Sequence, residues 1–268
     1  MKLYQKDELI SEIKKIFNRG WLTSVKSTID TRNDGAVGNT LETLLGLQEN
    51  NLPIPNANEW ELKGQRSHTN SLITLKHIEP SPQAAKIVSD ILLPKYGWPH
   101  KEAGKKYPPN EMSFRSTTNA QDFTYRGFKI VVDRTQQKVK FIFDSSKVDL
   151  SNTDIASWFN SVKKRVGIGQ IDPEPYWGFN DLEYAIGGKI KNCLYVIADT
   201  KIENKKEYFL YKELYVLSGF SFDKLLDCID DGSVLIDFDA RTGHNHGTKF
   251  RLKQGKWKQL YSSVEKVI

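Results

Sequence analysis

Apolar residues recur along this chain at two spacings, one helical and one strand-like. Leu9, Ile13 and Ile16 fall on one face of a helix, which predicts an amphipathic helix over residues 6–18, before Gly20. Similar spacing predicts helices over 38–47, 84–93, 154–166, 181–190 and 222–229. Strands are predicted around residues 56–63, 71–75, 123–133, 138–144, 193–198, 234–238 and 249–252, with 208–217 open between strand and helix.

This mixture of elements predicts an α/β or α+β fold with a central mixed β-sheet flanked by helices. Residues 134–137 join two β-rich runs, and the pair is predicted to be a hairpin. Residues 23–37 are polar and contain Asp34-Gly35, so they are predicted to be a loop.

A Glu-x-Lys pair, Glu61 and Lys63, lies on the strand predicted near residue 60. Side chains two apart on a strand share a face, so the carboxylate and the ammonium are expected to project together. A carboxylate can bind a divalent cation, and a neighbouring cation can orient or activate the attacking water. The pattern is common by chance as two solvated side chains, so other residues must support it.

The predicted helix over 38–47 precedes this strand. Asn39 or Thr40 is expected to cap it, which places Glu42 in the first turn. A carboxylate there either complements the helix dipole or leans toward a metal held by the following strand.

These motifs together resemble a known family. Gly-Asn-Thr-Leu-Glu-Thr-Leu-Leu at 38–45, Glu-Asn-Asn-Leu-Pro-Ile-Pro at 49–55, Glu-Leu-Lys at 61–63 and Ser-Leu-Ile-Thr-Leu at 71–75 look like the catalytic half of the MvaI/BcnI-type restriction endonucleases. That family is related to the MutH nicking enzyme within the PD-(D/E)xK nucleases. Residues 243–251 resemble its His-x-His-Gly-Thr-x-Phe-Arg segment. Two blocks in the same order make the resemblance specific.

The resemblance implies a MutH-like fold shaped as a two-lobed clamp, with residues 1–150 as the catalytic lobe and 151–268 as the DNA-recognition lobe. It implies Mg2+ as cofactor, with Mn2+ or Ca2+ able to substitute in binding, held by Glu61, Asn56 and Glu42 beside the catalytic Lys63. Double-stranded DNA is the expected partner. A monomer would nick the strands of a short G·C-rich site in separate events, with a companion DNA methyltransferase as a further expected partner.

Asn56 departs from the family, which has a metal-binding Asp five positions before the motif's Glu. An amide oxygen is a weaker Mg2+ ligand than a carboxylate, so cleavage is in question. Three explanations stay open: this branch uses Asn and relies on Glu42 or Glu59; the chain carries an inactivating substitution; or the protein binds DNA without cutting it. A MutH-like repair nickase that needs a partner protein is a further alternative.

The late block carries side chains suited to reading G·C pairs. Arg bonds to guanine N7 and O6, Asp accepts from cytosine N4, and His can do either. The alternatives are a polar surface hairpin, or a zinc pair formed by two of its histidines that lacks a third ligand. Lys76 and His77 are either DNA contacts or ordinary surface residues. The predicted DNA-binding residues are Asp239, Arg241, His244, Asn245, His246, Thr248, Arg251, Lys76 and His77.

Composition and charge indicate the kind of partner, the location and the state of the cysteines. The formal net charge of +6 favours a polyanionic partner, although 33 acidic residues are interspersed among 39 basic ones. Basic residues in the irregular stretch 94–119 are expected to follow phosphates; they are Lys95, His100, Lys101, Lys105, Lys106 and Arg115. No apolar run approaches the roughly 20 residues of a membrane span, and no signal peptide is evident, so the expected location is the cytoplasm. Cys193 and Cys228 are expected to form neither a zinc site nor a disulfide.

Overall fold

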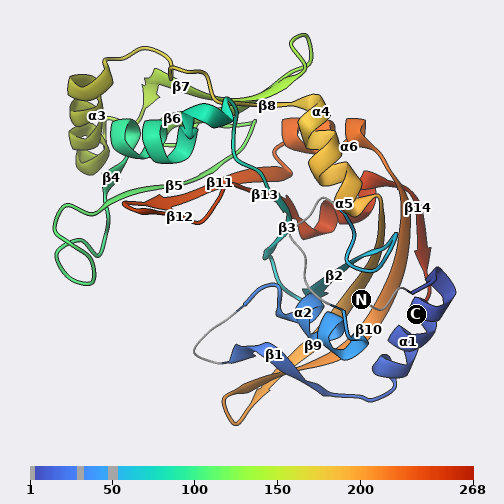
Figure 1. The fold of residues 1–268 in the computed structure, drawn as a ribbon. Helices are drawn as coiled ribbons and strands as arrows, with labels where there is room; N and C mark the ends of the chain where they lie inside the picture. Colours follow the sequence, from blue (N-terminus) through green and yellow to red (C-terminus); the bar gives the residue numbers. More distant parts are fainter. Residues whose placement is uncertain (1–3, 29–32, 48–53) are drawn as a thin grey trace. The chain divides into compact units, whose positions relative to one another are not determined.

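The computed structural model describes residues 4–28, 33–47 and 54–268. The chain forms two compact units, each assembled from separate segments (Figure 1). The first unit comprises Met1–Ile73, Glu183–Lys224 and Lys253–Ile268, and the second comprises Thr74–Leu182 and Leu225–Leu252.

These units differ from the lobes expected at 1–150 and 151–268. The physical reason is strand pairing: β9 (Asn192–Glu203) follows most of the second unit in the chain but pairs with β2 (Glu61–Arg66) in the first. A boundary drawn at one point along the sequence cannot describe such an arrangement. The assignment of catalysis and recognition to separate lobes stays a prediction.

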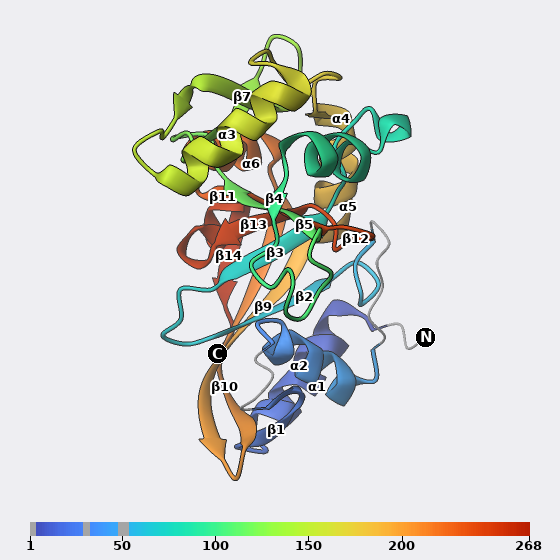
Figure 2. The same ribbon diagram turned by 90° about the vertical axis from the view of Figure 1, so that its left-hand side faces the viewer.

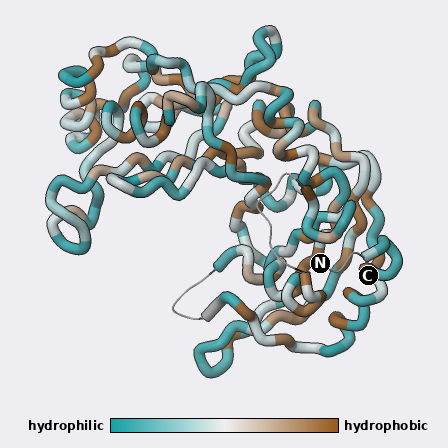
Figure 3. Tube along the Cα trace, in the orientation of Figure 1, coloured by the Kyte–Doolittle hydropathy of each residue, from teal (hydrophilic) through white to brown (hydrophobic). Residues whose placement is uncertain are grey.

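A five-stranded mixed sheet forms the centre of the first unit. Its order is β1 (Leu22–Thr28), β10 (Lys206–Phe220), β9 and β2, and β14 (Tyr261–Lys266) also pairs with β10. The β2–β9 pair is parallel, and the other pairs are antiparallel. Residues 208–217 are therefore strand. Figure 3 colours the turn between β9 and β10 as hydrophilic.

The loop expected over residues 23–37 is wrong at its start, where β1 pairs with β10. The pattern is misleading because Thr23, Val25 and Lys26 are all exposed, so this edge strand lacks the alternation of a half-buried one. The part of the prediction that falls on residues 29–32 lies outside the described residues.

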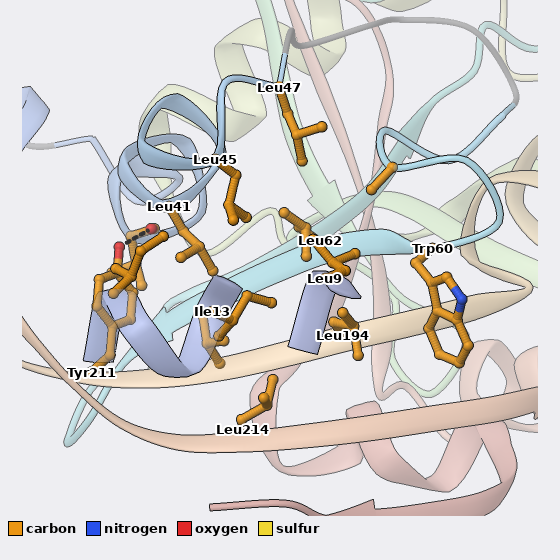
Figure 4. Packing of buried hydrophobic residues seen from close by; sticks show 14 of the residues in the cluster. Leu9, Ile13, Leu41, Leu45, Leu47, Trp60, Leu62, Leu194, Tyr211 and Leu214 are labelled. Carbon is orange, nitrogen blue, oxygen red and sulfur yellow. Dashed lines mark hydrogen bonds between the residues drawn. The ribbon is translucent and has the colours of Figure 1, made fainter. Parts of the chain in front are cut away.

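Two helices cover the core of the first unit, α1 (Lys6–Phe17) as predicted and α2 (Ala36–Leu45). Figure 4 shows their leucine and isoleucine side chains meeting those of the sheet, including Leu62, Leu194 and Leu214. Burial of this apolar surface is the main force that holds the helices on the sheet.

Helix α2 begins earlier than expected, after Gly35, so Asn39 and Thr40 lie inside it and neither caps it. Glu42 consequently lies in the second turn, which removes the expected first-turn interaction with the helix dipole. The helix ends at Gly46, whose φ of 71° is the left-handed conformation that glycine adopts without strain.

Helix α2 lies unusually close to β2. A Cβ atom added at Gly64 would come within 2.8 Å of Val37 Cγ1 and 2.9 Å of the Gly38 backbone nitrogen. Only glycine fits such an approach of helix to strand. The contact holds the helix that carries Glu42 against the strand that carries Glu61.

The second unit contains two sheets. The six-stranded sheet has the order β3 (Leu72–His77), β13 (Lys249–Lys253), β11 (Val234–Arg241), β5 (Met112–Thr118) and β4 (Trp98–Pro99), with β12 (His244–Asn245) paired to β11. The three-stranded sheet has the order β6 (Arg126–Asp133), β7 (Lys138–Val148) and β8 (Tyr176–Gly178), which confirms the predicted hairpin. The strand predicted over 71–75 is confirmed as β3, and it belongs to a different sheet from β2.

The other helical predictions are confirmed in outline. Helix α3 (Thr153–Val166) is capped by Asn152, whose side chain accepts from the backbone nitrogens of Asp154 and Ile155, and it lies beside β7 in Figure 2. The remaining helical segments, with η marking 3-10 or π-helical turns, are η1 (Gln83–Ala85), η2 (Ile87–Tyr96), α4 (Phe179–Leu182), η3 (Glu183–Gly187), α5 (Gly188–Ile190), α6 (Phe222–Asp230) and η4 (Gln254–Leu260). Over the described residues, no helix is long and apolar enough to span a membrane.

Candidate active site

The Glu61 and Lys63 side chains meet on one face of β2, as the alternation of the strand predicts. Lys63 Nζ lies 2.9 Å from Glu61 Oε1. The Glu61 side chain is 1% exposed and that of Lys63 is 19% exposed. The pair is therefore a shielded ion pair at the start of a central strand, and the alternative of two solvated side chains is excluded.

Asn56 joins three of the site's side chains. Its Nδ2 donates to Glu42 Oε1 at 2.9 Å, and its Oδ1 accepts from Lys189 Nζ at 3.2 Å. Its backbone nitrogen donates to Glu61 Oε2 at 3.1 Å. This orientation of the amide is the one its partners require, because a carboxylate accepts and an ammonium only donates.

Lys189 is a member of this cluster that the sequence does not predict. It lies on α5 and is 133 residues from Asn56 along the chain. Nζ also lies 3.2 Å from the Ile54 carbonyl oxygen and 3.5 Å from Glu61 Oε2, and the side chain is 8% exposed. No motif surrounds it, so only the fold reveals that it belongs to this cluster.

Burial and charge act differently on the two lysines. Burial alone would lower the pKa of the Lys63 ammonium. Attraction to Glu61 and the hydrogen bond that Lys63 donates to it, with smaller attractions from Cys193 and Glu42, outweigh burial, so the net pKa is raised. Burial lowers the pKa of Lys189 overall, despite the attraction of Glu61, and the positive charge of Lys63 adds to the lowering. Lys63 is therefore the more firmly protonated of the two.

Two tyrosine hydroxyls fix helix α2, which carries Glu42. Tyr211 Oη donates to the Val37 carbonyl oxygen at 2.8 Å, the bond drawn as a dashed line in Figure 4, and Tyr4 Oη donates to the Leu45 carbonyl oxygen at 2.8 Å. Both ends of the helix are thus anchored to other elements of the first unit. Glu42 itself is buried, at 7% exposure.

The cluster offers oxygen donors of the kind that Mg2+ takes, namely the carboxylates of Glu42 and Glu61 and the amide oxygen of Asn56. In type these residues fit a divalent cation. With Asn at position 56, however, the described residues contain no group of three or more His, Cys, Asp or Glu side chains that could hold a metal. Glu59, raised as a substitute ligand, is exposed in the turn before β2. An ion in the cluster would also meet the ammonium groups of Lys63 and Lys189.

The predicted base-reading residues in the second unit form a charged face on β11 and its neighbours. Asp239 pairs with Arg115 at 2.8 Å and with Lys249 at 3.5 Å. Arg241 Nη1 lies 3.0 Å from Glu111 Oε1, and its guanidinium stacks over the Tyr107 ring at 4.7 Å. Each group is held by a partner of opposite charge or by an aromatic ring.

Arg251 belongs to the same face and lies 2.8 Å from Asp237 Oδ2. The turn between β11 and β13 carries the exposed residues His244, Asn245 and His246. Ring nitrogens of the two histidines are 3.3 Å apart. This spacing is a direct contact between the rings, and the described residues provide no third ligand for zinc.

Thr248 differs from its predicted neighbours because its side chain is fully buried. Its backbone nitrogen donates to Glu79 Oε1 at 2.8 Å, and its hydroxyl lies 3.4 Å from Glu79 Oε2. This burial argues against the direct DNA contact expected for Thr248. The residue fixes the base of the turn.

Lys76 and His77 lie at the end of β3, close to Lys249. Burial, together with the charges of Lys249 and Lys76, lowers the pKa of His77. The side chain is exposed at the surface, so it stays available to a ligand in its neutral form.

The basic stretch 94–119 is not one irregular loop, because it contains β4 and β5. Lys101, Lys105 and Lys106 are exposed in the segment between these strands, which is largely hydrophilic in Figure 3. His100 is instead buried, its Nδ1 accepts from the Glu102 backbone nitrogen, and its ring packs 4.7 Å from that of Tyr107. His100 is thus a structural residue, whereas the three lysines of the segment are exposed; their contact with phosphates stays a prediction.

Comparison with known proteins identifies the family. The model of the MvaI/BcnI restriction endonuclease family matches residues 10–261. Among solved structures, the complex of restriction endonuclease MvaI with cognate DNA substrate is similar, with a TM-score of 0.73 and 22% identity over 99% of this chain and 100% of that chain. MvaI in the absence of DNA gives a TM-score of 0.54 and 22% identity over 100% of both chains. No curated protein matches the chain.

At this identity the structural likeness establishes the fold, and the mixed α/β prediction is confirmed. The MutH-like detail stays an expectation. The family match spans both the Glu61 and Lys63 motif and the turn at His244, and part of the stretch 49–55 that supported the resemblance lies outside the described residues. The chain belongs to the MvaI/BcnI restriction endonuclease family, whose activity class is cleavage of DNA.

Proposed function

We propose that this protein is a type II restriction endonuclease that hydrolyses double-stranded DNA at a short G·C-rich site with Mg2+ as cofactor. The observation that carries the proposal is the shielded Glu61–Lys63 pair, with nitrogen and oxygen 2.9 Å apart, beside the bonded side chains of Glu42 and Asn56. The family gives the activity class, and the buried cluster supplies chemistry that suits it.

Each side chain of the cluster has a distinct part in this proposal. Glu61, Glu42 and Asn56 would hold the cation, which when bound supplies positive charge against the phosphate. The Lys63 ammonium, fixed by Glu61, donates a hydrogen bond to the attacking water and orients its lone pair toward phosphorus. The water oxygen bonds to phosphorus while one P–O ester bond breaks; the water releases one proton to solvent, and the leaving oxygen takes up a proton from solvent.

Recognition would come from the charged face of the second unit. Arg241 and Arg251 are suited to guanine, and Asp239 to cytosine. Lys76, His77, His244, Asn245 and His246 supply further donors and acceptors at the surface. We also propose that the protein acts as a monomer in the cytoplasm, nicks the two strands in separate events, and works beside a DNA methyltransferase that protects the host.

A second candidate function is sequence-specific DNA binding without cleavage. Asn56 favours it, because the amide is bonded to both Glu42 and Lys189 and adds no negative charge for a metal. The MutH-like repair nickase has no such specific support. It would show weak cleavage that rises when a partner protein is added.

Supercoiled plasmid incubated with Mg2+ tests the proposal. The wild-type protein should nick it, Asn56→Asp should be at least about tenfold faster, and Lys63→Ala should be slower by about 100-fold or more. Lys201→Ala, a matched change on the exposed end of β9, should match the wild type. Specific DNA binding with no nicking by any variant would establish the second candidate, and absence of both binding and nicking would refute the nuclease proposal.

A further inference from the structure

The candidate active site of the first unit already contains a cation where a metal ion could bind. We call this group the buried cluster; its members are Glu42, Asn56, Glu61, Lys63 and Lys189. The Lys189 ammonium lies 3.2 Å from the Ile54 carbonyl oxygen, 3.2 Å from Asn56 Oδ1 and 3.5 Å from Glu61 Oε2. All three are hard oxygen donors of the kind that divalent cations take. An ammonium and a divalent ion would therefore compete for the same oxygens.

The amide of Asn56 suits this arrangement because it has a donor and an acceptor on one side chain. Nδ2 donates to Glu42 Oε1 while Oδ1 accepts from Lys189. An ionised Asp at this position would have only acceptors, so one of its oxygens would face Glu42 Oε1 with no hydrogen between them. Two buried carboxylates at that distance repel unless a proton or a cation lies between them.

We infer that Lys189 is the resident counter-ion of this site and that, together with Asn56, it determines how strongly the site takes a divalent cation. The amide and the ammonium assemble the carboxylates without a metal, and a divalent ion binds by displacing the ammonium. Lys189 is thus a specificity-determining residue for the cation. The inference rests on the proposed function, since it takes this cluster to be the catalytic site.

Binding of Mn2+ in the absence of DNA tests this directly, with free Mn2+ measured by electron paramagnetic resonance. Lys189→Met keeps the length of the side chain and removes its charge, so it should bind Mn2+ about tenfold or more tightly than the wild type. Asn56→Asp should also bind more tightly, and the double variant most tightly. Lys201→Met, on the exposed end of β9, should equal the wild type. Unchanged or weaker Mn2+ binding by Lys189→Met overturns the inference.

Thermal unfolding of Asn56→Asp gives a second readout. It does not use the Lys189→Met protein, so it holds even if that variant fails to fold. Asn56→Asp should melt about 3 °C or more below the wild type in EDTA, because Glu42 then faces a second carboxylate. Added Mn2+ should raise the melting temperature of Asn56→Asp more than that of the wild type. Equal melting of the two proteins in EDTA contradicts the inference.

Neither readout involves DNA, so the outcomes separate this inference from the proposed function. Plasmid nicking with no effect of Lys189→Met on Mn2+ binding would retain the nuclease and reject the counter-ion role of Lys189. Tighter Mn2+ binding by Lys189→Met without plasmid nicking would retain the counter-ion role and reject the cleavage activity.

Discussion

The buried cluster of the first unit and the charged face of the second unit hold their charges in contrasting ways. In the cluster, Glu61 is 1% exposed and Lys189 is 8% exposed, and each contacts partners from distant segments. On the face, Arg115 is 45% exposed, and its partner Asp239 comes from the neighbouring strand.

This difference in exposure indicates how the stability of each region responds to amino-acid substitution. A buried charge that loses its partner keeps the full cost of its desolvation, whereas a charge at the surface can return to water. The cluster should therefore tolerate almost no substitution without loss of stability. The charged face should change its ligand preferences while the fold persists.

The largest expected effect is on stability, for Glu61→Ala. Removal of this carboxylate leaves the buried Lys189 ammonium and the partly buried Lys63 ammonium with one counter-charge fewer. The free energy of unfolding should fall by about 3–5 kcal/mol. Urea denaturation followed by circular dichroism measures it.

Glu203→Ala is the matched control, because Glu203 pairs with Lys201 at the exposed end of β9. It should change the free energy of unfolding by no more than about 0.5 kcal/mol. Equal losses for the two variants would contradict the contrast between buried and surface charge.

The next largest effect concerns DNA affinity, for Arg241→Ala. Loss of the guanidinium should weaken binding by about 1–3 kcal/mol for a duplex that the protein selects from a random pool, because the bidentate contact to guanine that we propose for Arg241 could no longer form. Fluorescence anisotropy on that duplex measures the affinity. Arg134→Ala removes an arginine of the β6–β7 hairpin as control; Arg134 is 47% exposed, against 27% for Arg241. Similar weakening by both variants would show that Arg241 contributes charge without base recognition.

A smaller effect is expected for Asp239→Ala on stability. Its partners Arg115 and Lys249 remain solvated after the change, so the free energy of unfolding should fall by about 0.2–1 kcal/mol. Urea denaturation beside Glu61→Ala compares the two regions directly. A loss as large as that of Glu61→Ala would remove the distinction between them.

The smallest expected effect is the pH dependence contributed by His77. Burial and the charges of Lys249 and Lys76 lower its folded-state pKa below the ordinary value of 6.5. The unfolded chain then binds more protons between the two pKa values, so stability is full above pH 6.5 and falls as the pH drops through that window. His77→Gln should show a shallower loss of melting temperature between pH 7 and pH 5. An unchanged slope would mean that His77 contributes nothing to it.

The sequence allowed prediction of most of the charged turn but only part of the cluster, for a physical reason. His244, Asn245 and His246 are consecutive in the chain, so their proximity needs no knowledge of the fold. Glu61 and Lys63 are likewise linked by strand alternation. Lys189 reaches them only because β9 pairs in parallel with β2, a long-range contact that no local pattern encodes.

Predictions of elements failed where local pattern and burial disagreed. The edge strand β1 mixes polar residues with an exposed Val25 and lacks a regular apolar alternation, so its sequence predicts a loop. Helix α2 begins after Gly35 without a side-chain cap. The sequence signal for a cap at Asn39 or Thr40 therefore predicts a start that is too late, and it places Glu42 in the first turn when it lies in the second. Thr248 is a polar residue in a polar turn, so the sequence predicts that it is exposed. Its burial against Glu79 depends on tertiary packing.

The parallel pairing of β2 with β9 also bears on synthesis of the protein. Leu194, Phe209 and Leu214 complete the core under α1 and α2, so a ribosome has made more than two thirds of the chain before that core can close. We expect an unfinished chain, and hence a nascent nuclease, to be inert toward the DNA of the cell that makes it. Circular dichroism of a fragment ending at Leu182 tests this, since a stably folded first unit in that fragment would contradict it.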